Sequence, residues 1–429
     1  MEPILPAPPE QLPAEPAAAP TATVKPAYPP TAEIPTQEGP DGIRYDFNQG
    51  ARVLLPARTS GQWRVRLRDV ETGNILFNSE NAGALIASTK RWFVRFGIEV
   101  WDLEGDAERL VLEHKLDLTG QDVLIQFPVG TLGDTLAWFP YAARFASKHP
   151  GSRIICAMSG LIIPILRAGY PDITFLTHEE VVEQGIAATA YATYCLGLFF
   201  DDVACEWQPT DFRLVGLHRT AGYILGVDPA EEPATITLPD ETRPIAAPYA
   251  VIAVQSSSGC KYWNNPEGWR AVVKHLTSLG YRVICIDQKP VHGHGLLWTQ
   301  IPHGSEDETG DRPLAERARW LRHADLFVGL SSGLSWLAWS VGCPAVLISG
   351  FTHPRNEFNT PFRVINWHTC NSCWNDTRLR FDHGDFQWCP RHANTPRQFE
   401  CTRLITAEQV IGVINTVPSC KQVLAGAAS

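Results

Sequence analysis

The sequence predicts an α/β protein in which two doubly wound, Rossmann-like domains face each other across a cleft. Two consecutive series of short apolar runs that alternate with helix-like stretches predict this core. Before them, a region of alternating apolar and polar residues is typical of a small antiparallel β domain. After them, four cysteines at metal-ligand spacing indicate a metal-binding segment.

These patterns divide the chain into six parts. The expected parts are a disordered tail at 1–40, a small β domain at 41–118, an N-terminal Rossmann-like acceptor domain at 119–240, a C-terminal Rossmann-like donor domain at 241–365, a four-cysteine segment at 366–404 and a C-terminal helix and tail at 405–429. Because the carboxyl ends of parallel strands hold ligands in such sheets, we expect a site in the cleft between the two domains.

The tail at 1–40 contains twelve prolines and eight alanines. Such a composition offers few large side chains to bury and favours extended polyproline II. We therefore expect disorder, in a segment that is either a linker or a docking arm.

The β domain is predicted from four segments that alternate apolar with polar residues: 51–55, 63–67, 74–77 and 92–101. Residues 69–74 (DVETGN) supply turn chemistry between two of them. A run of short alternating segments joined by such turns predicts antiparallel pairing.

The first Rossmann-like series begins with apolar strands at 122–127, 153–157 and 173–175, with a helix at 134–149 after the first strand. The turn at 127–136 has glycines on both sides of Thr131 and carries Asp134 at the expected helix start. By residue type alone Asp134 is an N-cap, since Asp is among the best caps. The alternative is a carboxylate that faces the cleft as a general base.

The second series has strands at 249–255, 282–287 and 326–329 and helices at 266–279, at 314–323 and from Ser335. The first strand leads into a loop of small residues with Lys261 before a helix, and the third leads into the turn Ser331-Ser332-Gly333-Leu334-Ser335. A lone lysine in a loop is usually only solvated, and an ordinary serine-capped turn is hard to distinguish from a phosphate loop by its residues alone. Two such loops at matching ends of one sheet favour binding of a diphosphate.

The four cysteines Cys370, Cys373, Cys389 and Cys401 follow a C-x2-C-x15-C-x11-C pattern. Four thiolates can close a tetrahedron around zinc or iron and leave no open position, so the ion is expected to hold structure. A redox dithiol is the alternative. We expect His368, His383 and His392 to be exposed, and the remaining cysteines to be small buried hydrophobes.

Composition excludes several classes of protein. The formal net charge is -10, which disfavours sequence-independent binding to nucleic acid or anionic membranes. No basic, apolar leader begins the chain and no apolar run approaches the roughly 18 residues of a membrane span. We therefore expect a soluble cytoplasmic protein without nucleic-acid or membrane partners.

Taken together, the motifs resemble the bacterial autotransporter heptosyltransferases of the TibC type, which are relatives of the lipopolysaccharide heptosyltransferases of glycosyltransferase family 9. The resemblance covers residues 41–417. It is carried in chain order by the segments 43–48 and 100–101, the turn 133–136, residues 261–263 with Trp269, the turn 329–335, residues 357–362 and the four cysteines.

The resemblance implies a GT-B fold with a β-barrel-like N-terminal domain and inverting transfer of heptose from ADP-heptose to serines of an autotransporter passenger protein. It also implies an iron (Fe3+) site of four thiolates, with zinc as the alternative, a homo-oligomer such as a dodecamer, and no catalytic divalent metal.

The resemblance also assigns roles to residues. Asp134 matches the family's catalytic aspartate, and Lys261 matches the lysine at the donor phosphates. The turn Ser331–Ser335 matches the pyrophosphate loop. Thr131 and Gly133 are also expected to bind the donor. Two other functions stay open: a lipopolysaccharide-type transferase with a saccharide acceptor, and a non-catalytic nucleotide-sugar-binding scaffold.

Overall fold

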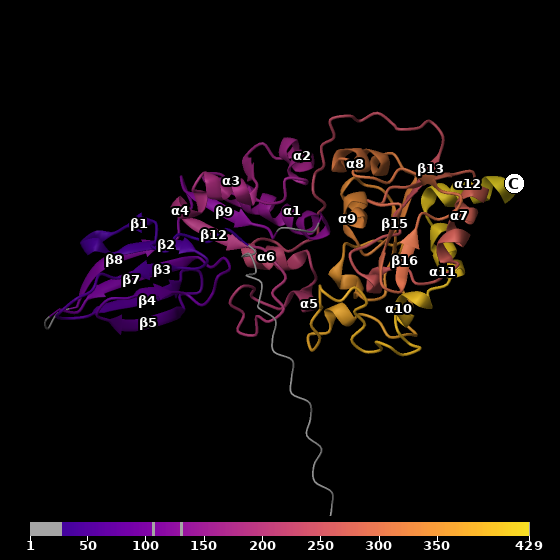
Figure 1. Cartoon of the computed structure of the whole chain (residues 1–429). Helices are drawn as coiled ribbons and strands as arrows, with labels where there is room; N and C mark the ends of the chain where they lie inside the picture. Colours follow the sequence, from indigo (N-terminus) through magenta and orange to yellow (C-terminus); the bar gives the residue numbers. More distant parts are fainter. Residues whose placement is uncertain (1–27, 105–107, 129–131, 429) are drawn as a thin grey trace, which may run out of the picture.

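The computed structural model describes residues 28–104, 108–128 and 132–428. Two α/β halves lie side by side, drawn in magenta and orange, and antiparallel strands in indigo extend from the far side of the first half (Figure 1). This arrangement confirms the predicted α/β class with an antiparallel N-terminal region. Within the described ranges, no helix has the length and apolar character required to cross a membrane.

A four-stranded antiparallel sheet forms the outer part of the N-terminal region, in the order β5-β4-β7-β8. Its strands are β4 (Trp63–Asp69), β5 (Ile75–Asn81), β7 (Phe96–Asp102) and β8 (Arg109–Lys115). As the alternation predicts, the apolar side chains of β4 are buried and the arginines between them are half-buried. The turn that joins β4 to β5 lies where its turn residues predict, because the Asp69 carboxylate accepts hydrogen bonds from the next residues of the turn.

The remaining N-terminal strands belong to the sheet of the first Rossmann-like half. This eight-stranded sheet contains β1 (Gln37–Glu38), β2 (Arg44–Asn48), β3 (Arg52–Leu54), β6 (Leu85–Ala87), β9 (Asp122–Gln126), β10 (Arg153–Ala157), β11 (Ile173–Leu176) and β12 (Ala192–Cys195). Strands β9 to β12 are parallel, and β12 also pairs in parallel with β2, with Ala192 opposite Phe47. The boundary predicted at 118 therefore does not separate two independent sheets.

The prediction of a disordered tail that extends to residue 40 overestimates the length of the tail. The Tyr28 hydroxyl donates to the Leu196 carbonyl at 2.7 Å, the Ala32 amide donates to the Ala187 carbonyl at 3.2 Å, and β1 pairs with β2. Residues 28–40 are thus held against the edge of the first sheet by hydrogen bonds that proline content does not reveal. Residues 1–27 lie outside the described part of the chain.

The helices of the first half are α1 (Leu132–Lys148), α2 (Ile163–Leu166), α3 (His178–Glu183), α4 (Ile186–Thr189), α5 (Phe212–Val215) and α6 (Arg219–Leu225). Helix α1 is the longest and buries Trp138, Phe139 and Tyr141 completely. One hydrophobic cluster joins Trp138 of the first half to Trp336 and Phe358 of the second. The two halves therefore share part of their core.

The second half is built on a six-stranded parallel sheet in the order β17-β14-β13-β18-β19-β20. Its strands are β13 (Tyr249–Ile252), β14 (Arg282–Cys285), β17 (Glu306–Asp307), β18 (Leu326–Leu330), β19 (Ala345–Ile348) and β20 (Arg363–Val364), and its helices are α7 (Gly268–Ser278), α8 (Leu314–Arg322), α9 (Gly333–Ser340), α11 (Ala407–Ile414) and α12 (Pro418–Ala428). Strands β13, β14 and β18 and helices α7, α8 and α9 match the predicted second series to within a few residues, whereas β17, β19 and β20 were not predicted.

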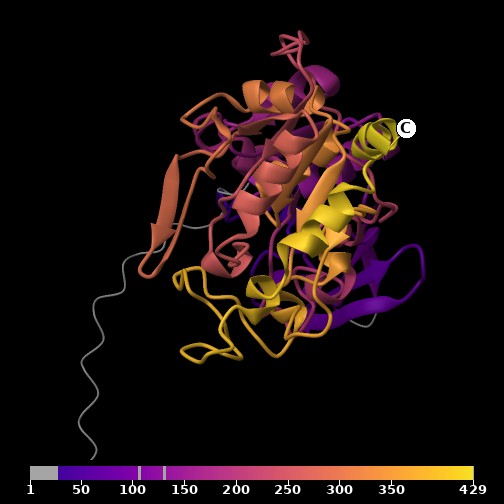
Figure 2. The same cartoon turned by 90° about the vertical axis from the view of Figure 1, so that its right-hand side faces the viewer.

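Smaller elements complete the second half. The hairpin of β15 (Val291–His294) and β16 (Leu297–Gln300) stands apart from the sheet, and the loops of the four-cysteine segment lie below it in yellow (Figure 2). The short helices are η1 (Pro40–Gly42), η2 (Arg167–Gly169), η3 (Gly259–Lys261), η4 (Pro354–Asn356), η5 (Cys373–Asn375) and α10 (Glu400–Arg403).

Candidate active site

Helices α1 and α9, one from each half, approach each other at two glycines. A Cβ atom on Gly133 would lie 3.3 Å from the Gly333 Cα, and a Cβ on Gly333 would lie 3.0 Å from the Gly133 backbone nitrogen. Larger residues would separate the two helices. Since each glycine lies in the first turn of its helix, this contact brings both helix N-termini and the Asp134 side chain to one place.

A pocket of about 540 Å³ opens beside this contact. The predicted site residues that line it are Gly133, Asp134, Lys261, Ser331, Ser332, Gly333 and Leu334. The carboxylate, the lysine and the start of α9 therefore share one cavity between the two halves, as expected from strand ends that face the same cleft. Thr131 lies outside the described residues.

Asp134 is the third residue of α1 and is half-buried. The cap interpretation placed it before the first turn, whereas the structure places it inside that turn. An acidic side chain still interacts favourably with the helix dipole there, and its place in the pocket also lets it face a ligand.

Ser335 does not line the pocket. It is 1% exposed, and its hydroxyl donates to the Leu330 carbonyl, so it is turned into the fold. The prediction that Ser335 contacts the donor is at odds with this position, because the side chain of this third residue of α9 points back toward the end of β18.

Ser331 and Ser332 differ in what they offer to a ligand. The Ser331 hydroxyl donates to the Glu357 carboxylate. The Ser332 hydroxyl is buried and has no hydrogen-bond partner among the described residues. Because the first amides of a helix also lack intrahelical partners, Ser332 and the start of α9 present unpaired donors to an anion in the pocket.

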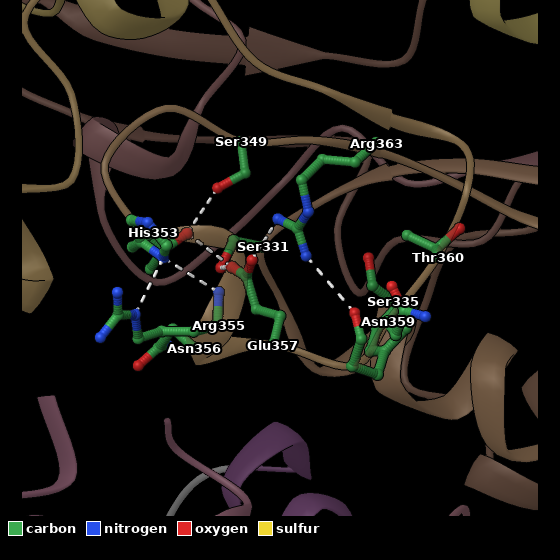
Figure 3. A network of polar contacts seen from close by, with 12 residues as sticks. Ser331, Ser335, Ser349, His353, Arg355, Asn356, Glu357, Asn359, Thr360 and Arg363 are labelled. Carbon is green, nitrogen blue, oxygen red and sulfur yellow. Dashed lines mark hydrogen bonds and ion pairs between the residues drawn. The ribbon is translucent and has the colours of Figure 1, made fainter. Parts of the chain in front are cut away.

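The Glu357 carboxylate organises this turn (Figure 3). It is 3% exposed and accepts from Thr352 Oγ1 at 2.6 Å, from Arg363 at 2.5 Å and from Ser331. Ser349 bonds Thr352 in turn at 2.5 Å. A buried carboxylate with this many donors fixes the loop that leads into α9, so the proton of the Ser331 hydroxyl is used to position the turn.

Replacing Glu357 by Gln is expected to loosen this turn. The change removes one partner of a buried ion pair, which typically costs about 3–5 kcal/mol of stability, and we expect weaker ADP binding as well. Chemical unfolding and ADP titration measure the two effects. Glu306→Gln is the matched control, since its ion pair with Arg282 has both side chains exposed. Equal behaviour of the two variants would contradict the role given to Glu357.

Lys261 is held by contacts with the four-cysteine segment. The Gly259 amide donates to the Phe386 carbonyl at 2.8 Å, and a Cβ at Gly259 would lie 2.4 Å from Leu297 Cδ1. The Lys261 ammonium lies 5.5 Å from the centre of the Phe351 ring. The turn η3 therefore packs tightly between the β15–β16 hairpin and segment 366–404, with its lysine directed to the pocket.

Sequence reasoning missed several residues that line the pocket. Trp374, Phe381 and His383 reach it from the four-cysteine segment. His383 is exposed as predicted, although its ring is partly covered by the pocket wall. This partial burial lowers its pKa, the Lys261 charge lowers it further, and the Asp134 carboxylate raises it.

Asp287 is a further residue of the pocket lining that sequence reasoning missed. It is 2% exposed, accepts from the amides of Val254 and Gln255, and has its pKa raised to about 6, chiefly by burial. An acidic residue at the end of the predicted strand 282–287 was the available signal.

The four predicted cysteine ligands lie near one another. Burial raises the pKa of the Cys401 thiol well above its usual value, and neighbouring Cys373, Cys389 and Cys370 raise it further. Among the described residues, the ligand atoms that lie mutually within 4.8 Å are those of Cys370, His392 and Glu400. His392 is therefore part of the cluster and not merely an exposed residue, and the predicted set of four thiols is seen only in part.

The donor chemistry of this cluster fits a thiophilic ion. Burial raises the pKa of Cys373 and Cys401, and repulsion between neighbouring thiolates raises it further. A cation between the thiolates would lower these pKa values. Sulfur-rich donor sets select iron or zinc. Glu400, whose carboxylate belongs to this group, accepts a hydrogen bond from the Cys370 amide at 2.9 Å and pairs with Arg397, so it helps to fix the position of Cys370.

Two family models match the chain. They are Glycosyltransferase TibC, N-terminal domain, over residues 39–104, and Glycosyltransferase family 9 (heptosyltransferase), over residues 225–374. Together with two Rossmann-like halves and the pocket between them, they define the chain as a glycosyltransferase of the GT-B fold.

Similar proteins identify the family within this class of glycosyltransferases. Autotransporter heptosyltransferase BAHTCr of Citrobacter rodentium is 55% identical over 383 residues, 89% of this chain and 91% of that protein. Inactive autotransporter heptosyltransferase BimC of Burkholderia thailandensis is 46% identical over 418 residues, 96% of this chain and 95% of that protein. The chain belongs to the autotransporter heptosyltransferase family.

Solved structures agree with this assignment. The crystal structure of the iron-containing dodecameric glycosyltransferase TibC from enterotoxigenic Escherichia coli H10407 has a TM-score of 0.84 and 54% identity, and the match covers 90% of this chain and 98% of TibC. A TibC complex with ADP-D-β-D-heptose also has a TM-score of 0.84, with 53% identity over 91% of this chain and 98% of TibC.

Proposed function

We propose that this chain transfers heptose from ADP-heptose to serine hydroxyls of an autotransporter passenger protein, with inversion in a single displacement. The observation that carries the proposal is the pocket in which Asp134 lies with Lys261 and the start of α9. The similarity to TibC, which has been solved with ADP-D-β-D-heptose, supports the choice of donor.

In the proposed reaction Asp134 accepts the proton of the serine hydroxyl. The serine oxygen attacks the anomeric carbon, the bond from that carbon to the diphosphate oxygen breaks, and ADP leaves with the electron pair. Lys261, the Ser332 hydroxyl and the first amides of α9 stabilise the negative charge that grows on the diphosphate. These donors supply the charge stabilisation in the scheme, and no divalent ion takes part in it.

Lys261→Ala is expected to weaken ADP binding by roughly 10- to 100-fold, since hydrogen bonds to charged groups contribute about 1.5–3 kcal/mol. Isothermal titration with ADP measures the change. Lys274→Ala serves as the control, because Lys274 is exposed on α7. ADP binding that is the same in both variants would remove Lys261 from the donor site.

The thiols of Cys370, Cys373, Cys389 and Cys401 would hold Fe3+, with zinc as the alternative. The ion's contribution is structural: four thiolates fold the segment around it and leave no position for a substrate. Iron is favoured because TibC is an iron-containing enzyme.

We further propose a homo-oligomer, with the dodecamer of TibC as the template, and a cytoplasmic location. None of the eleven cysteines, all of which lie in the described ranges, is paired in a disulfide, which suits a reducing compartment. Size-exclusion chromatography with light scattering measures the assembly.

A second candidate is a non-catalytic scaffold that binds a nucleotide sugar. It is favoured by one observation, the 46% identity to BimC, which is named as inactive. A scaffold would bind ADP-heptose through the same pocket without turnover.

Co-expression with a candidate autotransporter passenger tests these alternatives. The intact mass of the passenger should rise in increments of one heptose, and an Asp134→Ala co-expression should give the unmodified mass. Tight ADP binding with no mass change on any passenger would favour the scaffold. Heptose label that appears in lipid and not in protein would favour a lipopolysaccharide-type transferase.

A further inference from the structure

A second concavity of about 540 Å³ adjoins the active-site pocket. It is lined by residues 198–204, Glu206, Trp207 and Arg380. We call it the side groove. Leu198 lines both the side groove and the pocket, so the two cavities are neighbours that share a wall.

That wall is made of two strips of chain. One strip is 198–201 of the first half and the other is 380–383 of the four-cysteine segment. Arg380 pairs with Asp201 at 2.6 Å, and the Phe200 and His383 rings lie 6.4 Å apart. Arg380 faces the side groove while His383 lines the pocket near Asp134. A ligand in the groove is therefore separated from the base by one layer of side chains.

The carboxylates of the side groove are already engaged by the protein. Asp202 accepts hydrogen bonds from the amides of Glu206, Trp207 and Gln208. Asp201 pairs with Arg380, and Glu206 lies 3.7 Å from Arg91. These interactions fix the conformation of the loop. Because the charged groups of the groove already have partners, we do not expect it to bind a cation or a second phosphate.

The side groove presents polar and apolar surface in similar amounts, and much of its apolar part is aromatic. Phe199 and Trp207 are stacked with their ring centres 5.4 Å apart and an interplanar angle of 17°. Val203 is 95% exposed at the rim, an unusual exposure for a valine. Aromatic surface with a polar rim is typical of sites that bind polypeptide.

We infer that the side groove binds the acceptor polypeptide next to the serine that is modified. This inference rests on the proposed function, since it requires a protein acceptor. A serine that enters the pocket leaves its neighbours outside, and an extended chain advances about 3.3 Å per residue, so a few residues beyond the serine reach a cavity that shares the pocket wall. The mixed aromatic and polar lining suits both the side chains and the backbone of such a segment.

The test measures initial rates of heptose transfer to a purified passenger fragment with the full-length protein. Val203→Asp places a charge on the exposed rim without disturbing the core, and Trp207→Ala removes half of the ring stack. Both should raise the KM for the passenger by roughly tenfold or more, the effect of losing one well-packed contact, with unchanged kcat and unchanged ADP affinity. Trp207→Phe should restore most of the affinity.

Leu161→Ala is the matched control, because Leu161 is 76% exposed outside both cavities. Unchanged passenger KM in both Val203→Asp and Trp207→Ala would overturn the inference, and so would a KM change that native mass spectrometry traces to altered assembly. Failure of the proposed function looks different: the wild-type protein would then modify no passenger at all.

Discussion

Asp134→Asn is expected to lower the rate of heptose transfer by on the order of 10²- to 10⁴-fold, the usual contribution of a general base, while ADP binding stays within about twofold. Asparagine keeps the size of the side chain and an oxygen that accepts hydrogen bonds. It cannot take the proton of the serine hydroxyl. Single-turnover transfer to a purified passenger measures the loss.

This substitution also separates the two interpretations of Asp134. If the side chain served only the start of α1, the variant would lose about 0.3–1 kcal/mol of stability through the helix dipole, and transfer would continue. Thermal unfolding of the same variant measures that contribution. Wild-type rates in Asp134→Asn would remove the base from the scheme, whatever the effect on stability.

The position of the site was predictable because it follows from topology. Parallel strands place their carboxyl ends at one edge of a sheet, so the loops at 255–269 and 331–335, which follow two strands of the second sheet, were expected to lie together. The contact between Gly133 and Gly333 was not predictable from either local pattern. It arises from packing between two halves that lie far apart in the sequence.

Which hydroxyl faces the ligand was also beyond the sequence. Ser331, Ser332 and Ser335 look equivalent in a Ser/Gly turn. Their roles are set by Glu357, which engages Ser331, and by the direction of the first turn of α9, which buries Ser335. The pairing of β2 with β12 was not predictable either, because the alternation within a strand does not indicate which distant strand it pairs with.

The segment 366–404 is predicted from spacing as a separate metal module, yet the structure makes it part of the active site. It supplies Trp374, Phe381 and His383 to the pocket wall, and Phe386 supports the turn that carries Lys261. The proposed metal site and the proposed donor site therefore share one piece of chain. Loss of the ion is therefore expected to weaken binding of the donor phosphates.

Cys373→Ser is accordingly expected to abolish stoichiometric metal binding and to reduce ADP affinity more than tenfold. Cys373 is 8% exposed in a cluster with Phe212, Trp374 and Trp388, so the segment cannot keep its fold without the ligand. Structural thiolate sites contribute on the order of 10 kcal/mol to folding. Elemental analysis, ADP titration and limited proteolysis of the segment measure the three consequences.

Cys343→Ser is the matched control, since Cys343 is equally buried but packs in the core that contains Tyr249 and Trp320. It should lose little metal and keep its ADP affinity. If Cys373→Ser lost the metal and still bound ADP as the wild type does, the segment would be a module beside the active site and not its wall. If the two sites share a wall, Cys373→Ser should show both weakened ADP binding and rapid cleavage within 366–404, because the loops that would hold the ion also hold Lys261.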